Sequence, residues 1–175
     1  MAGRPVEQEQ NASAFYASLG KDVSYFAAIW HAYKVGQLLM TDLDRICRGQ
    51  DLSMADVHLL GVIRIDDPKP LRATDLAQTL HVSNAVLSTR IARLESKKLV
   101  TRTPSLQDRR AFTLKLAPAG VAALDAAIEA VSRRANFVKR YRGLSDVDRA
   151  TLVRILGQLH DELDRDFVST ARGET

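Results

Sequence analysis

The chain has 175 residues, 46% of them hydrophobic and 26% charged, and a formal net charge of +4. This composition is that of one folded domain, alone or with an extended helical part, and excludes a disordered chain. The strongest apolar run, residues 59–65, is short and contains Arg64, which excludes a membrane span. The polar N-terminus predicts no secretory signal, and the single cysteine, Cys47, cannot form an internal disulfide. We therefore expect a cytoplasmic protein.

The chain begins with a polar stretch, residues 1–20, that we expect to be a loose leader. A first long helix is predicted from about Asp22 to Ile46, because apolar residues recur along one side of it at helical spacing. Gly49 is expected to end this helix.

Three shorter helices are predicted next. Ser53 and Asp56 have the form of a capping box, which opens a second helix that runs through Ile65. Two prolines place a turn at residues 66–70. A third, short helix is predicted to start at Thr74, whose hydroxyl can cap it.

A tight connection at residues 81–82 leads to a fourth helix, which Ser83 is expected to cap. Its apolar face carries Leu87, Ile91 and Leu94, and its opposite face carries Ala85, Thr89, Ala92, Arg93 and Ser96. Residues 100–103 and 111–116 alternate like the two strands of a hairpin. Helix, tight turn, helix and basic hairpin together indicate a winged helix-turn-helix.

Basic residues concentrate in the segment 83–115. It contains eight basic and two acidic residues, a net charge of +6, so the rest of the chain carries −2. A localised basic face on an otherwise acidic chain is typical of a protein that binds a phosphate backbone. The alternative is a solvated charged surface, which would normally mix the two signs more evenly.

Two further helices are predicted after the hairpin. Pro118 suits the first turn of a helix that Gly143 ends, and Ser145 is expected to cap the last helix. Apolar residues recur at spacings of three and four in the first (Val121, Leu124, Ile128, Val131, Ala135 and Val138) and at similar spacings in the second (Leu152, Ile155, Leu156, Leu159, Leu163 and Phe167). We expect these faces to bury against a second copy of the chain.

The stretch DLAQTLHVSNAVLSTRIARLESKKLVTRTPSLQDRRAFTLKLAPAG, residues 75–120, resembles the winged helix-turn-helix of the MarR family of transcriptional regulators. The wing pattern D-x-R-x-x-x-L-x-L of that family is present as Asp108, Arg110, Leu114 and Leu116. The Leu-Glu and Leu-Val pairs that lead from recognition helix to wing are present at residues 94–95 and 99–100. The resemblance covers roughly residues 22 to 168.

Three positions depart from the family pattern. Lys98 replaces the usual glycine after the recognition helix, so a non-glycine residue is expected to adopt a left-handed conformation there. Ala117 replaces a threonine, so the next helix loses a side-chain cap. Ala92 stands at an often acidic position that can pair with the wing arginine, which suggests that Arg110 is less tethered in this chain.

The resemblance implies a mainly α fold with a small β-hairpin wing, in which the N- and C-terminal helices form a dimerisation domain. After the leader, residues 21–50 would be the first dimerisation helix, 51–117 the winged helix-turn-helix DNA-binding domain, and 118–170 the C-terminal dimerisation helices. The partner would be double-stranded DNA with a pseudo-palindromic operator, bound by a homodimer. No membrane partner is expected.

The residues expected to contact DNA lie on the fourth helix and on the wing. Short side chains near the helix N-terminus suit base edges in the major groove, and the arginines farther along suit phosphates. These helix residues are Ser83, Asn84, Ala85, Ser88, Thr89, Arg90 and Arg93. On the wing, Arg110 is predicted to enter the minor groove, with Asp108 holding the turn and Arg109 on a phosphate. A solvated turn with a local salt bridge is the alternative for the wing.

The resemblance also implies a small effector, an aromatic acid or its thioester, bound between the dimerisation helices and the DNA-binding domain. Aromatic rings with basic or titratable groups could hold such a molecule. The candidates are Phe26, Trp30, His31 and Tyr33 on the first helix and His58 and Arg64 on the second. The alternative is that these aromatic residues are only dimer core.

No nucleophile, metal or nucleotide motif supports catalysis, and no cofactor or metal is expected. Cys47 would act as a peroxide sensor only with a lowered pKa, and residues 160–162 most simply form a solvated helix face. The sequence therefore predicts a dimeric, sequence-specific, ligand-responsive transcriptional repressor and not an enzyme. The alternative is a winged-helix module that binds another protein.

Overall fold

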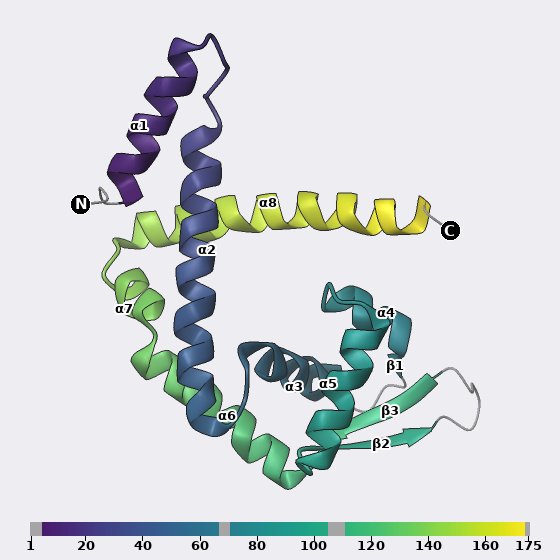
Figure 1. The fold of residues 1–175 in the computed structure, drawn as a ribbon. Helices are drawn as coiled ribbons and strands as arrows, with labels where there is room; N and C mark the ends of the chain where they lie inside the picture. Colours follow the sequence, from purple (N-terminus) through teal and green to yellow (C-terminus); the bar gives the residue numbers. More distant parts are fainter. Residues whose placement is uncertain (1–4, 67–70, 105–110, 174–175) are drawn as a thin grey trace. The chain divides into compact units, whose positions relative to one another are not determined.

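The computed structural model describes residues 5–66, 71–104 and 111–173, and the chain divides into two compact units, Met1–Leu43 and Asp44–Thr175 (Figure 1). The architecture is mainly helical with a small antiparallel sheet, as predicted. None of the helices in these described ranges is both long and apolar enough to cross a membrane.

The N-terminal unit contains helix α1, Pro5–Ser18, where the sequence predicted a loose leader. That expectation was wrong because α1 has almost no apolar periodicity but is rich in glutamate, glutamine and alanine, which favour a helix. Proline is also well tolerated in a first turn. Gly20, with a φ of 70°, lies in the turn that follows.

Helix α2, Phe26–Cys47, begins later than predicted because Asp22 does not start it. The carboxylate of Asp22 instead accepts a hydrogen bond from the backbone N–H of Ser24, at 2.9 Å, which holds a turn before the helix. The last turn of α2 belongs to the second unit, and a short 3-10 helix, η1, Arg48–Gln50, follows it directly.

The winged helix-turn-helix occupies the middle of the second unit. Its elements are α3 (Met54–Asp66), β1 (Leu71–Arg72), α4 (Ala73–Thr79), α5 (Asn84–Ser96), β2 (Val100–Pro104) and β3 (Ala111–Leu116). The sheet has the order β1-β3-β2, and both pairings are antiparallel. Strand β1 was not predicted, because two residues carry no periodicity. Helix α4 begins at Ala73, so Thr74 lies inside its first turn and does not cap it.

The local signals around α3 and α5 predicted the structure correctly. The Ser53 hydroxyl accepts from the backbone N–H of Asp56 at 3.1 Å, and the Asp56 carboxylate accepts from the backbone N–H of Ser53 at 2.7 Å, which completes the capping box. Ser83 accepts from the backbone N–H of Val86 at 3.3 Å and caps α5. Lys98 has a φ of 56°, the left-handed conformation expected of it.

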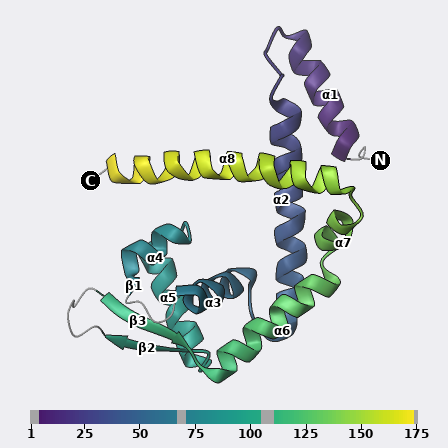
Figure 2. The ribbon, with the colours of Figure 1, turned by 180° about the vertical axis from the view of Figure 1, so that it is seen from behind.

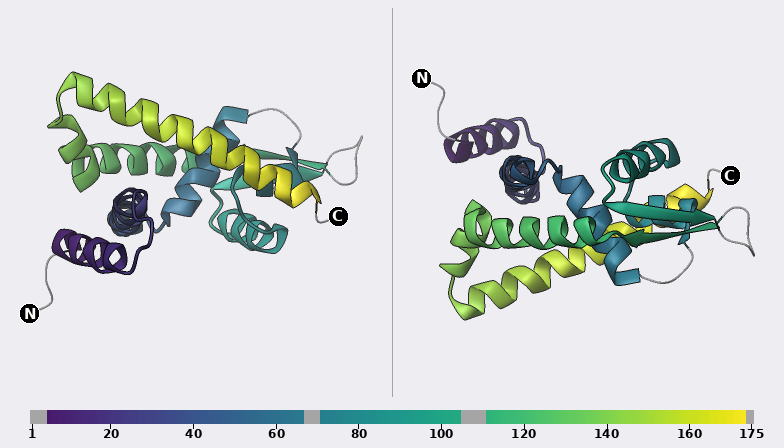
Figure 3. Two further views of the ribbon diagram at one scale, coloured as in Figure 1. Left: turned by 90° about the horizontal axis from the view of Figure 1, so that it is seen from above. Right: turned by 90° about the horizontal axis from the view of Figure 1, so that it is seen from below.

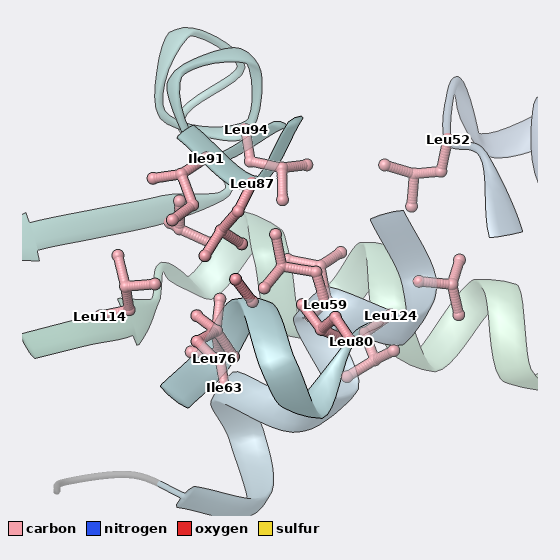
Figure 4. Close-up of a cluster of buried hydrophobic side chains, with 14 of the residues drawn as sticks. Leu52, Leu59, Ile63, Leu76, Leu80, Leu87, Ile91, Leu94, Leu114 and Leu124 are labelled. Carbon is pink, nitrogen blue, oxygen red and sulfur yellow. The ribbon is translucent and has the colours of Figure 1, made fainter. Parts of the chain in front are cut away.

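The core of the second unit is built from side chains of α3, α4, α5, β3 and α6 (Figure 4). The predicted apolar face of α5, namely Leu87, Ile91 and Leu94, is buried there. Leu124 is also buried in this core, with 2% of its surface exposed. Since Leu124 was expected in a dimer seam, this part of the interface prediction was wrong. Apolar spacing identifies a buried face but not what it is buried against.

The helix after the wing is broken in two. Helix α6, Pro118–Arg134, ends at Ala135, whose ψ of 126° is extended, and α7, Asn136–Arg142, follows. The Arg142 guanidinium donates to the Ser132 carbonyl at 3.1 Å, a carbonyl near the end of α6 that would otherwise need a helical partner. Ala117 precedes α6 without a side-chain cap, as predicted. Helix α8, Asp146–Gly173, is capped by Ser145.

Gly120 fixes how α6 approaches the base of the hairpin. A Cβ atom at this position would lie 2.0 Å from the backbone oxygen of Leu99, so only glycine fits. The same oxygen accepts a hydrogen bond from the backbone N–H of Ala117 at 2.9 Å. In both views of Figure 3, β2 and β3 lie side by side and extend away from α6.

Candidate nucleic-acid interface

Helix α5 presents a polar face to solvent on the side opposite its buried leucines. Ser83, Asn84, Ala85, Ser88 and Thr89 are all exposed. The Thr89 hydroxyl donates to the backbone carbonyl of Ala85 at 3.0 Å. Short side chains of this kind allow a helix backbone to approach the edges of bases.

An open groove of about 480 Å³ runs along this face and is lined by Ser53, Ala85, Val86, Thr89, Arg90 and Arg93. Three of the lining residues, Ala85, Thr89 and Arg93, follow one another at spacings of four and therefore form one line along α5. One lining residue, Ser53, directly precedes α3.

Arg93 is engaged by the protein itself, which the sequence did not reveal. Its guanidinium pairs with Oδ2 of Asp56, and the Asp56 side chain is fully buried. Burial by itself raises the pKa of Asp56, but hydrogen bonds from the backbone and hydroxyl of Ser53 and from Arg93 together lower this pKa below its ordinary value of 3.8. The carboxylate is therefore charged at neutral pH. The pair joins residues 37 positions apart, so no local pattern could have revealed it.

A second cation, directly after α5, pairs with an aspartate whose side chain is exposed. Nζ of Lys97, the residue that follows α5, donates to the backbone oxygen of Asp51 at 2.5 Å and lies 2.7 Å from Oδ2 of that aspartate. Asp51 itself has a φ of 54°, an uncommon conformation for a residue other than glycine.

The hairpin of β2 and β3 lies near α5 (Figure 2), and Arg102 is at the middle of its paired strands. The Arg102 guanidinium lies over the Phe112 ring, 4.3 Å from its centroid, and Phe112 is buried. This cation–π contact holds the Arg102 guanidinium against the hairpin. The predicted wing-tip residues, Asp108, Arg109 and Arg110, lie outside the described residues.

The aromatic residues proposed for an effector lie in the N-terminal unit. The rings of Phe26 and Trp30 are stacked with centroids 6.1 Å apart, and the Tyr16 ring of α1 lies 6.0 Å from Phe26. Lys34, which was not among the predicted residues although it lies four residues after Trp30, places Nζ 5.4 Å from the Trp30 ring and 5.5 Å from the Tyr33 ring. His31 is exposed.

The other two effector candidates lie on α3, in the second unit. His58 is exposed. Arg64 is also exposed but forms an ion pair with Asp125 of α6, so its guanidinium already has an anionic partner in the protein.

Cys47 is fully buried, and this burial, together with the charges of Asp44 and Asp56, raises the pKa of its thiol. A raised pKa keeps the thiol protonated and unreactive at neutral pH, which argues against a peroxide sensor. Within the described ranges, no group of three or more histidine, cysteine, aspartate or glutamate side chains is placed to hold a metal ion.

Comparison with known proteins supports the winged helix-turn-helix assignment. Residues 50–111 match the model of the MarR family. A protein of Thauera aromatica, described as a candidate transcriptional regulatory protein for the hcr operon, is 34% identical over 104 residues. The match covers 58% of this chain and 61% of that relative, so the chain spans less than two thirds of the relative's length.

Solved structures share the fold. AbsC, a MarR family transcriptional regulator from Streptomyces coelicolor, is 23% identical, with a TM-score of 0.68 over 82% of this chain and 96% of its own. A mutant of MarR from E. coli, solved in complex with operator DNA, is 22% identical, with a TM-score of 0.67 over 79% of this chain and 99% of its own. Members of this family are DNA-binding transcription regulators and not enzymes. Through residues 50–111, which include most of its winged helix-turn-helix, the chain is similar to the MarR family.

Proposed function

We propose that this protein is a sequence-specific DNA-binding transcriptional regulator that acts in the cytoplasm as a homodimer and represses its target genes. The observation that carries the proposal is the exposed polar face of α5, whose opposite face is buried in the core. On a surface helix that binds no partner, the outer face only has to be soluble, and long charged side chains would suffice for that. This helix instead exposes short side chains at its N-terminal end, from Ser83 to Thr89, where a recognition helix meets base edges.

The charges around this face support DNA over a protein partner. The segment 83–115 carries a net charge of +6. Arg90 borders the groove on α5, and Arg102 lies at the middle of the hairpin strands. Both positions suit contacts with the phosphates on either side of a major groove that receives α5. The wing residues Arg109 and Arg110 are proposed to extend the contacts, with Arg110 in the minor groove and Asp108 orienting the turn.

A homodimer is proposed because two helices expose apolar residues that one copy leaves uncovered. Helix α8 exposes Ile155, Leu156, Leu159 and Leu163, and α2 exposes Ile29, Tyr33, Leu38 and Met40. Burying such residues against an equivalent surface is favourable by roughly 25 cal/mol per Å² of apolar area. A two-fold dimer would bind a pseudo-palindrome whose half-site centres lie about one helical turn, ~10 bp, apart.

We further propose that a small aromatic acid or its thioester releases the protein from DNA. An aromatic ring could pack against the stacked rings of Phe26 and Trp30. Lys34 could pair with the acid group, with Tyr33 and His31 beside it. His58 and Arg64 remain candidates from α3. Release requires only that the effector bind the DNA-incompetent state more tightly than the competent state.

The test is selection of duplexes from a random DNA library by the purified protein, followed by titration of the selected duplex. We expect one enriched pseudo-palindromic sequence. Replacing Ser88 and Thr89 by alanine should lower affinity for that sequence by about 1–3 kcal/mol for each base that the helix no longer recognises, while binding to unrelated DNA stays nearly unchanged. Enrichment of no sequence would overturn the proposal. Trp30→Ala should weaken release by the true effector without changing DNA binding in its absence.

A further inference from the structure

We infer that Arg93 is a positioning residue, which holds the recognition helix α5 in place through Asp56 and does not contact a DNA phosphate. The inference rests on the proposed function, because it concerns how α5 is presented to DNA. It departs from the sequence-based expectation that Arg93 contacts the backbone.

The environment of Asp56 is the first observation that supports a positioning role for Arg93. Its side chain is fully buried, and Oδ2 accepts from the Ser53 backbone N–H at 2.7 Å, from the Ser53 hydroxyl at 2.7 Å and from the Arg93 guanidinium. Its Oδ1 atom is buried with no hydrogen-bond partner among the described residues. Arg93 is thus the cation that neutralises this buried carboxylate, and moving Arg93 to a phosphate would leave a buried charge unpaired.

Two side chains near the C-terminal end of α5 also attach it to the segment from Asp51 to Asp56, at the start of α3. Arg93 is tied to the start of α3, and Lys97, four residues later, is tied to Asp51 just before it. Met54, the first residue of α3, is in turn fixed by its backbone N–H, which donates to Asp44 of α2 at 2.7 Å. The C-terminal end of α5 is therefore anchored to a short, hydrogen-bonded segment.

Arg90, which lines the same groove one turn earlier, differs from Arg93 in its surroundings. Arg90 has no ion-pair partner among the described residues, whereas the Arg93 side chain is 47% exposed and paired. The two arginines thus have different tasks. Arg90 is available to DNA, and Arg93 sets the angle at which the short side chains before it reach the groove.

The experiment compares Arg93→Gln, Asp56→Asn and the matched control Arg90→Gln, all as full-length protein. The probe is the duplex that the unmodified protein selects from a random library. The dissociation constant is measured across a range of salt concentrations, and hydrogen exchange of residues 84–96 is measured without DNA. Thermal unfolding confirms that each variant is folded.

A positioning role predicts that Arg93→Gln and Asp56→Asn each weaken binding, by about tenfold. Neither should change the salt dependence, and both should speed exchange in α5. The double variant should be little worse than either single one, since both break one interaction. Arg90→Gln should instead flatten the salt dependence by about one unit per protomer and leave exchange unchanged.

A phosphate contact by Arg93 predicts the opposite pattern. Arg93→Gln would then flatten the salt dependence as Arg90→Gln does, and Asp56→Asn would tighten binding by removing a competing negative charge. Either result would overturn the inference and leave the proposed function intact. Failure of the unmodified protein to select any duplex would overturn the proposed function together with the inference.

Discussion

Helices α5 and α8 are both amphipathic, but their apolar faces have opposite environments. Helix α5 buries its apolar residues in the core of its own unit and leaves a short polar face in solvent. Helix α8 leaves apolar residues exposed, from Ile155 to Leu163, and its described part contributes no buried residue. The partner of a surface is expected to match its chemistry. The contrast therefore supports the proposal that α5 binds DNA and that α8 packs against a second copy of the chain.

The largest expected effect is on the buried face of α5. Leu87→Ala removes a fully buried side chain and should lower the free energy of unfolding by about 2–5 kcal/mol. Urea unfolding at two protein concentrations would measure it. In a monomeric background, with Leu156 and Leu159 replaced by glutamate, the matched change Leu163→Ala should leave the free energy of unfolding nearly unchanged because Leu163 is 66% exposed. A similar loss in both variants would remove the distinction between the two helices.

The next effect concerns association through α8. Replacing Leu156 and Leu159 by glutamate places charges on the exposed apolar face, so the protein should sediment as a monomer while its circular dichroism is retained. Gln158→Glu, which adds a charge on a polar part of the same helix, is the control and should leave the dimer intact. A dimer that survives the double substitution would show that α8 is not the interface.

Acid should weaken the attachment of α5 through Asp56. Because the pKa of this carboxylate is lowered in the folded state, its stabilisation is present above pH 3.8 and is lost as the pH falls through the lower folded pKa. The unmodified protein should therefore lose more stability between pH 5 and pH 3 than the Asp56→Asn variant, as followed by urea unfolding. Asp125→Asn, at an exposed ion pair, should behave like the unmodified protein. Parallel curves for all three would contradict the lowered pKa.

The smallest effect is a gain in stability at the start of α6. Ala117 has an extended backbone conformation and offers no side-chain cap, so Ala117→Ser should stabilise the fold by about 0.5–1 kcal/mol. Ala119→Ser, inside the first turn, cannot cap and should not stabilise it. Comparing the free energies of unfolding of the two variants would measure this difference.

Local signals in the sequence predicted much of the winged helix-turn-helix. The cap at Ser83, the capping box at Ser53 and the left-handed Lys98 all depend on a few neighbouring residues, and the structure has each of them. The prediction of which side of α5 is buried was also correct, because three apolar positions at helical spacing define a single face.

Features that depend on distant residues could not be predicted. The apolar pattern of α6 did not reveal that Leu124 belongs to the core of its own unit while Ile128 is 53% exposed. The break at Ala135 is supported by Arg142, which reaches back ten residues to Ser132. The pair of Asp56 and Arg93 gave no signal at all, because a single aspartate and a single arginine are common on any helix.

The most direct test is a hydroxyl-radical footprint of one selected duplex with the unmodified protein and with the variant that carries glutamate at positions 156 and 159. If α5 reads DNA and α8 joins two copies, the unmodified protein should protect two segments about 10 bp apart from centre to centre. The variant should need a much higher concentration and should then protect the segments independently. Joint protection of both segments by the variant, at the concentration that suffices for the unmodified protein, would contradict this division of roles between α5 and α8.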